Sequence, residues 1–132
     1  MMFLSKLEKN VETRYVVEKS FGCLVLELVA AKNLKNRDVW SVAKMQRQLF
    51  SKVVGDKVLP KKDTVMAFCF GLKLSLRESD EFMQAAGYAF SDRQLKDVIV
   101  RSFLASGEYD VLAVNAELWR HNIKPLTGKC DM

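Results

Sequence analysis

The sequence predicts a single all-α domain, and three observations lead to this prediction. Apolar residues recur at helical spacing along nearly the whole chain, with capping or turn residues between successive runs. No segment shows the alternation of apolar and polar residues that is typical of a β-hairpin. The chain has 132 residues, of which 49% are hydrophobic and 28% charged, and this is the size and composition of one globular domain.

The first three expected helices lie between residues 20 and 54. Ser20 is the expected N-cap of a helix over about 20–32, whose apolar residues share one face. A short helix that begins at Asn36 follows, and a break at Lys44-Met45 separates it from a third helix over 46–54. The inward residues expected for these helices are Phe21, Leu24, Val25, Leu28, Val29, Val39, Trp40, Ala43, Leu49, Phe50 and Val53.

Four further helices are expected between Pro60 and Pro125. One runs from Pro60 to about Leu72, and the next begins with a capping box of Ser75 and Glu78 and ends at Gly87. The sixth extends from Ser91 to Gly107, and the seventh is closed by Pro125 and Gly128. The expected inward residues of the first of these helices are Val65, Phe68, Cys69 and Leu72. One face of the sixth helix carries Leu95, Val98, Ile99, Ser102 and Phe103, and the apolar residues of the seventh are Val111, Leu112, Val114, Leu118 and Trp119. The pattern at 11–18 fits either a preceding helix or a β-branched arm.

Several classes of protein do not fit the sequence. No apolar run reaches the roughly 20 residues that span a bilayer, and the first residues do not resemble a secretory signal. Three widely spaced cysteines and a single histidine, His121, provide neither a disulfide framework nor metal-ligand spacing. No nucleophile motif or phosphate-binding loop is found. We therefore expect a cytoplasmic protein without enzymatic activity, cofactor or metal.

Residues 33–90 show an ordered series of a short helix, a tight turn, a second short helix, a basic loop and two amphipathic helices. The segments DVWSVAKMQRQLFSKV (38–53), LPKKDTVMAF (59–68) and LKLSLRESDEF (72–82) resemble the helix-turn-helix domain of phage-repressor or Xre-type regulators. The segments AGYAFS (86–91) and YDVLAVN (109–115) are similar to a bacterial subfamily with extra C-terminal helices.

This resemblance implies a λ-repressor-like helix-turn-helix bundle. Residues 1–19 would be an N-terminal arm or helix, and residues 20–90 the helix-turn-helix domain. Residues 91–132 would add two C-terminal helices packed on the same domain. The sequence departs from the family at Lys44, where a turn glycine is frequent, and at Trp40, where a small residue usually permits tight helix crossing. A left-handed Lys44 would cost about 1 kcal/mol, and the alternative is a more open turn.

The positive charge is concentrated in the same region. The net charge is +5, yet segment 35–62 alone contains eight Lys or Arg against two Asp, a net +6. Residues 67–132 contain eight basic and nine acidic residues and are close to neutral. A basic patch at one short helix and its following loop is the electrostatic signature of a duplex binder.

The resemblance implies that helix 46–54 enters the major groove of double-stranded DNA and that the protein regulates transcription. Arg pairs bidentately with guanine and Gln with adenine, whereas Lys fixes register on phosphates. The residues expected to contact DNA are Lys44, Gln46, Arg47, Gln48, Ser51, Lys52, Lys57, Lys61 and Lys62.

Alternatives remain open at this stage. The basic segment can equally be a solvated face without a partner, and Trp40 is expected to pack on the first helix instead of stacking on a base. The fold is also reused in protein-interaction adapters, including accessory or antitoxin components of bacterial and phage defence-related systems. A protein partner or a homodimer contact would then lie on the C-terminal helices, at Tyr88, Phe90, Tyr109, Leu112 and Trp119. A dimer contact through the arm at 11–17 is a further alternative.

Overall fold

The structure, a computed structural model, describes residues 20–127, and within this range it contains seven α-helices and no strand. The helices are α2 (Phe21–Ala31), α3 (Asn36–Ala43), α4 (Arg47–Val54), α5 (Lys62–Gly71), α6 (Leu76–Ala85), α7 (Leu95–Ser106) and α8 (Val111–Arg120). The all-α prediction is therefore confirmed for the described part of the chain. The predicted arm over 1–19 and the closing residue Gly128 lie outside the described residues.

Capping residues set several helix boundaries where the sequence predicts them. The Ser20 hydroxyl accepts a hydrogen bond from the Cys23 N–H and begins α2. Ser75 and Glu78 form the predicted capping box of α6, each side chain accepting from the backbone N–H of the other. Gly107 has a φ of 74° and ends α7 in the left-handed conformation that glycine adopts without steric cost.

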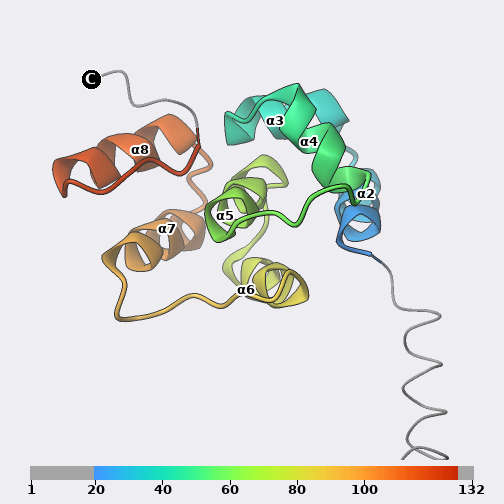
Figure 1. Ribbon diagram of the computed structural model, residues 1–132. Coiled ribbons are helices and arrows are strands. Elements are labelled where there is room, and N and C mark those ends of the chain that lie inside the picture. The colour runs from blue at the N-terminus through green and yellow to red at the C-terminus, as the bar shows by residue number, and fades with distance from the viewer. Residues whose placement is uncertain (1–19, 128–132) are drawn as a thin grey trace, which may run out of the picture.

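Helix α5 lies at the centre of the fold, with α7 and α8 on one side and α2, α3 and α4 on the other (Figure 1). Residues 65–71 are all buried, so the prediction of a single inward face was too narrow. The sequence VMAFCFG has no polar side chain in this stretch, and α3, α6 and α7 all pack against the helix. A helix that is apolar on every side is stable only when it is covered on every side.

Two glycines allow close contact between helices and the backbone next to them. A Cβ on Gly71 of α5 would lie 2.5 Å from the Val39 carbonyl oxygen of α3. A Cβ on Gly22 of α2 would lie 2.3 Å from the Val54 carbonyl oxygen of α4. The close contacts between helix backbones are thus made at Gly71 and Gly22.

Helix α7 differs from its prediction in both its start and its buried face. It begins at Leu95 instead of Ser91, because the Ser91 N–H donates to the buried carboxylate of Asp97 at 2.7 Å and leaves 91–94 outside the helix. With Asp97 turned inward, Val100 and Leu104 become the buried residues beside it. Leu95 and Val98, predicted to be inward, are 48% and 43% exposed. Of the other predicted residues Ile99 is buried, Phe103 is partly buried and Ser102 is exposed.

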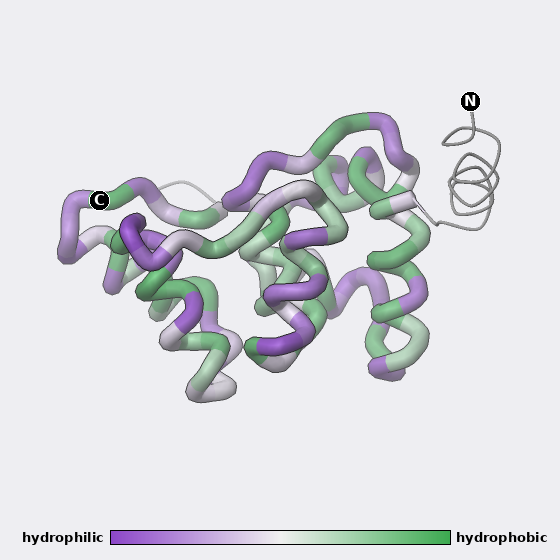
Figure 2. Tube along the Cα trace, turned by 90° about the horizontal axis from the view of Figure 1, so that it is seen from below, coloured by the Kyte–Doolittle hydropathy of each residue, from purple (hydrophilic) through white to green (hydrophobic). Residues whose placement is uncertain are grey.

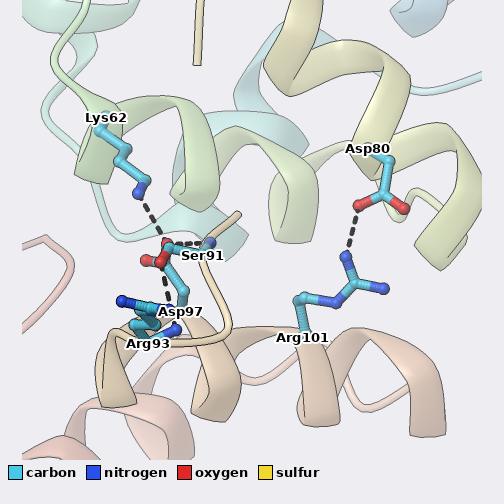
Figure 3. Close-up of polar contacts among 6 residues, drawn as sticks. All are labelled: Lys62, Asp80, Ser91, Arg93, Asp97 and Arg101. Carbon is cyan, nitrogen blue, oxygen red and sulfur yellow. Dashed lines mark hydrogen bonds and ion pairs between the residues drawn. The ribbon is translucent and has the colours of Figure 1, made fainter. Parts of the chain in front are cut away.

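Three ion pairs join α7 to α5 and α6, two of which are drawn in Figure 3. The Lys62 ammonium lies 2.6 Å from the carboxylate of Asp97, and Arg101 lies 2.9 Å from that of Asp80. The third pair joins Lys96 to Asp63 at 2.7 Å. Helix α7 is therefore joined to α5 and α6 by ion pairs in addition to the burial of Ile99, Val100 and Leu104.

The segment after α8 runs back along this helix and reaches the end of α3. Leu126 is 5% exposed, and its N–H donates to the side-chain oxygen of Asn115 in α8. The Thr127 hydroxyl donates to the carbonyl oxygen of Ala43, the last residue of α3. Both polar and apolar residues occur along the described part of the chain (Figure 2). None of the helices in residues 20–127 is long and apolar enough to cross a membrane.

Candidate nucleic-acid interface

Helices α3 and α4 form a compact pair of eight-residue helices joined by residues 44–46. The N-cap of α3 is Lys35, one residue before the predicted Asn36, and its N–H donates to the Asp38 carboxylate. Lys44 has φ 59° and ψ 36°, so the turn is left-handed and tight instead of open. The Met45 N–H donates to the Trp40 carbonyl and closes the turn.

Apolar packing fixes how α4 is oriented. Phe50 and Val53 are 2% and 1% exposed, and Leu49 is partly buried, as predicted. The Phe50 ring lies 5.9 Å from that of Phe68 in α5, so α4 is anchored in the central core. The Trp40 ring packs edge-on against Phe50 at 5.2 Å. Trp40 thus packs on α4, whereas the sequence analysis expected it on α2.

The opposite face of α4 carries the predicted reading residues. Gln46 is the N-cap, and Arg47 and Gln48 form the first turn. Ser51 and Lys52 follow one turn later, at the i+4 spacing that places side chains on the same face. All five residues are exposed. The structure therefore brings these five predicted residues together on one outward surface.

The loop after α4 presents two further lysines from a fixed backbone. The Asp56 carboxylate accepts from the Gly22 N–H at 3.0 Å, and the buried Pro60 accepts through its carbonyl oxygen from the Tyr88 hydroxyl at 2.8 Å. Lys57 and Lys61 are exposed beside these two anchors. Because the Gly22 N–H comes from α2 and the Tyr88 hydroxyl from the segment after α6, the loop is held at each end by a residue distant in sequence.

An exposed leucine in this loop was missed by the sequence analysis. The Leu59 side chain is 95% exposed, and Val58 beside it is 38% exposed. The sequence signal that could have found it is its place in a loop between Lys57 and Lys61, where no helical spacing assigns it to the core.

The basic residues divide into paired and unpaired groups. Among the described residues, no ion pair involves Lys44, Arg47, Lys52, Lys57 or Lys61, and all of them are exposed. Lys62 is different, because its ammonium is bound to the buried Asp97 carboxylate. We therefore leave Lys62 out of the candidate interface, which then contains eight of the nine predicted residues.

The residues predicted for a protein contact also divide into two groups. The Tyr88 hydroxyl donates to Pro60, as described above, and the Tyr109 hydroxyl donates to the Leu74 carbonyl at 2.8 Å. Both rings are partly buried and serve the internal packing. Leu112 and Trp119, in contrast, are 60% and 49% exposed on α8. Only these last two remain as candidates for an external contact.

Neither a buried thiolate nor a cluster of metal ligands is found among residues 20–127. Burial raises the pKa of the Cys69 thiol to about 12, so it is not a thiolate nucleophile at neutral pH. No group of three or more His, Cys, Asp or Glu among residues 20–127 is placed to hold a metal ion. The exposed His121 ring lies 3.2 Å from the Glu117 carboxylate on the same helix.

No family model, curated protein or solved structure matches this chain in comparisons with known proteins. The residues of the chain itself are thus the basis of the function proposed below.

Proposed function

We propose that residues 20–90 form a λ-repressor-like helix-turn-helix domain that binds double-stranded DNA, with α3 and α4 as the motif and α4 in the major groove. The observation that supports this most directly is the division of α4 into two faces. Its inward residues are apolar and anchored on α5, whereas Arg47, Gln48, Ser51 and Lys52 point outward. No side chain of this outward set has a hydrogen bond or ion pair within residues 20–127.

The chemistry of the outward face suits base recognition. Arg47 offers the bidentate donor fork that fits guanine, and Gln46 and Gln48 offer the amide pair that fits adenine. Lys44, Lys52, Lys57 and Lys61 provide unpaired ammonium groups around them for phosphates. Base contacts of this kind distinguish sequences, so we propose that the protein regulates transcription.

Fluorescence polarisation with a labelled random duplex tests the proposal. Five unpaired basic side chains that meet phosphates or bases predict a slope of about −4.5 for log affinity against log salt. Affinity should therefore fall about 10²- to 10³-fold between 50 and 200 mM salt. No binding at about 50 mM salt, or binding that does not depend on salt, would contradict the proposal.

A pair of double variants locates the interface. Arg47→Ala with Lys52→Ala should weaken binding by about tenfold or more, because it removes one base-reading and one phosphate-binding group. Arg77→Ala with Arg93→Ala is the matched control, since it removes the same charge from exposed positions outside segment 35–62. Equal losses in the two double variants would show that net charge, and not α4, controls binding.

The half-exposed Leu112 and Trp119 favour a second candidate function, a protein-interaction adapter or an accessory component of a defence-related system. In that case the Arg47 and Lys52 variant keeps its function, and a charge introduced at Trp119 removes it. The polarisation experiment separates the two functions, because an adapter has no need for salt-dependent binding to duplex DNA.

A further inference from the structure

Helix α8 presents an uncharged row to solvent. Leu112, Ala116 and Trp119 are all exposed, and their i, i+4, i+7 spacing places them on one side of the helix. The opposite side is buried through Val111, Val114 and Leu118. Helix α8 is therefore apolar on two sides, and only one of them is covered by residues of the same chain.

A hollow lies directly beside Trp119. Its volume is about 240 Å³, and its walls are Trp119, Asn122, Ile123, Lys124 and Pro125. A cavity of about 150 Å³ is enough to hold benzene, so this hollow has room for a leucine side chain. Trp119 thus belongs both to the exposed row on α8 and to an apolar hollow formed with the segment after the helix.

Leu112 and the hollow are arranged so that a second copy fits. Leu112 and Trp119 are seven residues apart, about 10 Å along the helix axis, and the small Ala116 lies between them. A two-fold axis near Ala116 would place two α8 helices antiparallel, with each Leu112 at the hollow beside the other Trp119. In such a two-fold interface the same surface of the two copies is in contact, and the small Ala116 at the axis lets the two helices approach closely.

The charges at the two ends of α8 favour the same arrangement. Glu108 and Asp110 precede the helix, and Arg120 and Lys124 lie at and beyond its end, all of them exposed. An antiparallel copy brings the acidic end of one helix to the basic end of the other. Residues 91–127 contain five basic and five acidic residues, so two copies meet here without net repulsion.

We propose that the protein forms a homodimer in which α8 of one copy packs antiparallel against α8 of the other, with Ala116 at the two-fold axis. The ten-residue helix is short for a standard interface, so the dimer is reversible, with a dissociation constant of about 1–100 µM. This proposal does not depend on DNA binding. If the DNA-binding function also holds, the dimer carries two reading helices related by the same axis.

Sedimentation equilibrium without DNA tests the dimer. Ala116→Glu places two like charges at the axis and should raise the dissociation constant at least ~100-fold. Leu26→Glu is the matched control, because Leu26 is 41% exposed on α2 and should leave the constant unchanged. Circular dichroism shows whether both variants remain folded. A protein that stays monomeric at about 0.5 mM, or a dimer that Ala116→Glu does not weaken, would overturn the proposal.

Two further variants test the register and remain decisive if Ala116→Glu unfolds. In a background with Cys23→Ser and Cys130→Ser, Ala116→Cys should form a disulfide-linked dimer under mild oxidation, and Leu95→Cys on α7 should not. Exchanging one charge by Glu108→Lys should weaken the dimer several-fold, and adding Lys124→Glu should restore it. Failure of both the cross-link and the charge restoration would exclude the antiparallel α8 contact.

Discussion

The α3–α4 end and the α7–α8 end of the molecule use their charged residues in opposite ways. At the α3–α4 end, apolar packing of Phe50 and Val53 holds the helices, and the basic side chains outside have no partner among the described residues. At the other end, Lys96 and Arg101 of α7 reach carboxylates on α5 and α6. Both ends are thus anchored by buried apolar side chains, but the basic groups of the α3–α4 end are unpaired, whereas those of α7 also form ion pairs with α5 and α6.

Lys62 shows why this difference matters for interpreting the sequence. By position it belongs to the basic segment, yet its ammonium is bound to Asp97 and helps to hold α7 (Figure 3). The charge that a segment carries in sequence is therefore larger than the charge it offers to a partner. The unpaired groups at the α3–α4 end contribute little to stability, so they are available for binding.

The largest expected effect comes from removing the charge that anchors α7. Asp97→Ala should destabilise the protein by about 3 kcal/mol, because it leaves the Lys62 ammonium and the Ser91 N–H without their acceptor. Urea unfolding at pH 7 measures the loss. Asp92→Ala, at an exposed position just before α7, should change stability by less than about 0.5 kcal/mol. Equal effects of the two variants would show that the α7 end is not held by its ion pairs.

At the α3–α4 end, the substitution with the largest expected effect on stability introduces a steric clash and changes no charge. Gly71→Ala should cost about 2 kcal/mol, because the added Cβ would meet the Val39 carbonyl oxygen, a backbone atom that cannot turn aside. The loss should be the same at low and high salt when urea unfolding is repeated in both. A cost that changes strongly with salt would mean that charge also contributes to the stability of this end.

Helix α6 connects the two ends, and its capping box should have an intermediate, pH-dependent effect. The Ser75 N–H, followed by the Lys32 ammonium at 3.1 Å, lowers the pKa of Glu78 below its ordinary value of 4.5. The resulting stabilisation is complete above pH 4.5 and is lost as the pH falls through the lowered pKa.

Ser75→Ala should cost about 1 kcal/mol at pH 7, because it removes the hydroxyl that accepts from the Glu78 N–H. Thermal melts of wild type and Glu78→Gln should differ most at neutral pH and converge in acid. A difference between these two proteins that grows in acid would contradict the assignment of the charged carboxylate as the stabilising form.

The smallest expected effect concerns the turn before α4. Two substitutions of Lys44 separate the effect of backbone conformation on stability from the effect of charge on DNA binding. Lys44→Gly should be more stable than Lys44→Ala by about 0.5–1 kcal/mol, because glycine adopts the left-handed conformation without a Cβ penalty. Both variants should reduce the salt slope of DNA binding by about 1, since each removes one ammonium. Unequal slopes in the two variants would mean that the shape of the turn, and not its charge, determines binding.

The helices and their ends could be predicted because local signals determine them. Ser20, the Ser75 and Glu78 box and Gly107 mark boundaries through contacts within a few residues, and the structure confirms them. The outward set on α4 was also predictable, since helical spacing separates it from Phe50.

The misplaced features depend on contacts between distant residues. Asp97 is buried because Lys62 and the Ser91 N–H meet it there, and this rotates α7 away from the face that its apolar spacing predicts. Residues 61 and 62 are both lysine, so no local signal distinguishes the exposed Lys61 from Lys62, which is paired with Asp97. The inward orientation of the Tyr88 side chain likewise depends on the Pro60 carbonyl, 28 positions earlier.

The bond between Thr127 and Ala43 has a consequence for the order of folding. The two residues are 84 positions apart, and the hydroxyl reaches the last carbonyl of α3, next to the turn that leads into α4. Because a chain is synthesised from its N-terminus, α3 and α4 leave the ribosome long before Thr127. The turn between α3 and α4 is thus synthesised well before the residue that tethers it, and this tether can form only after α8 has been made.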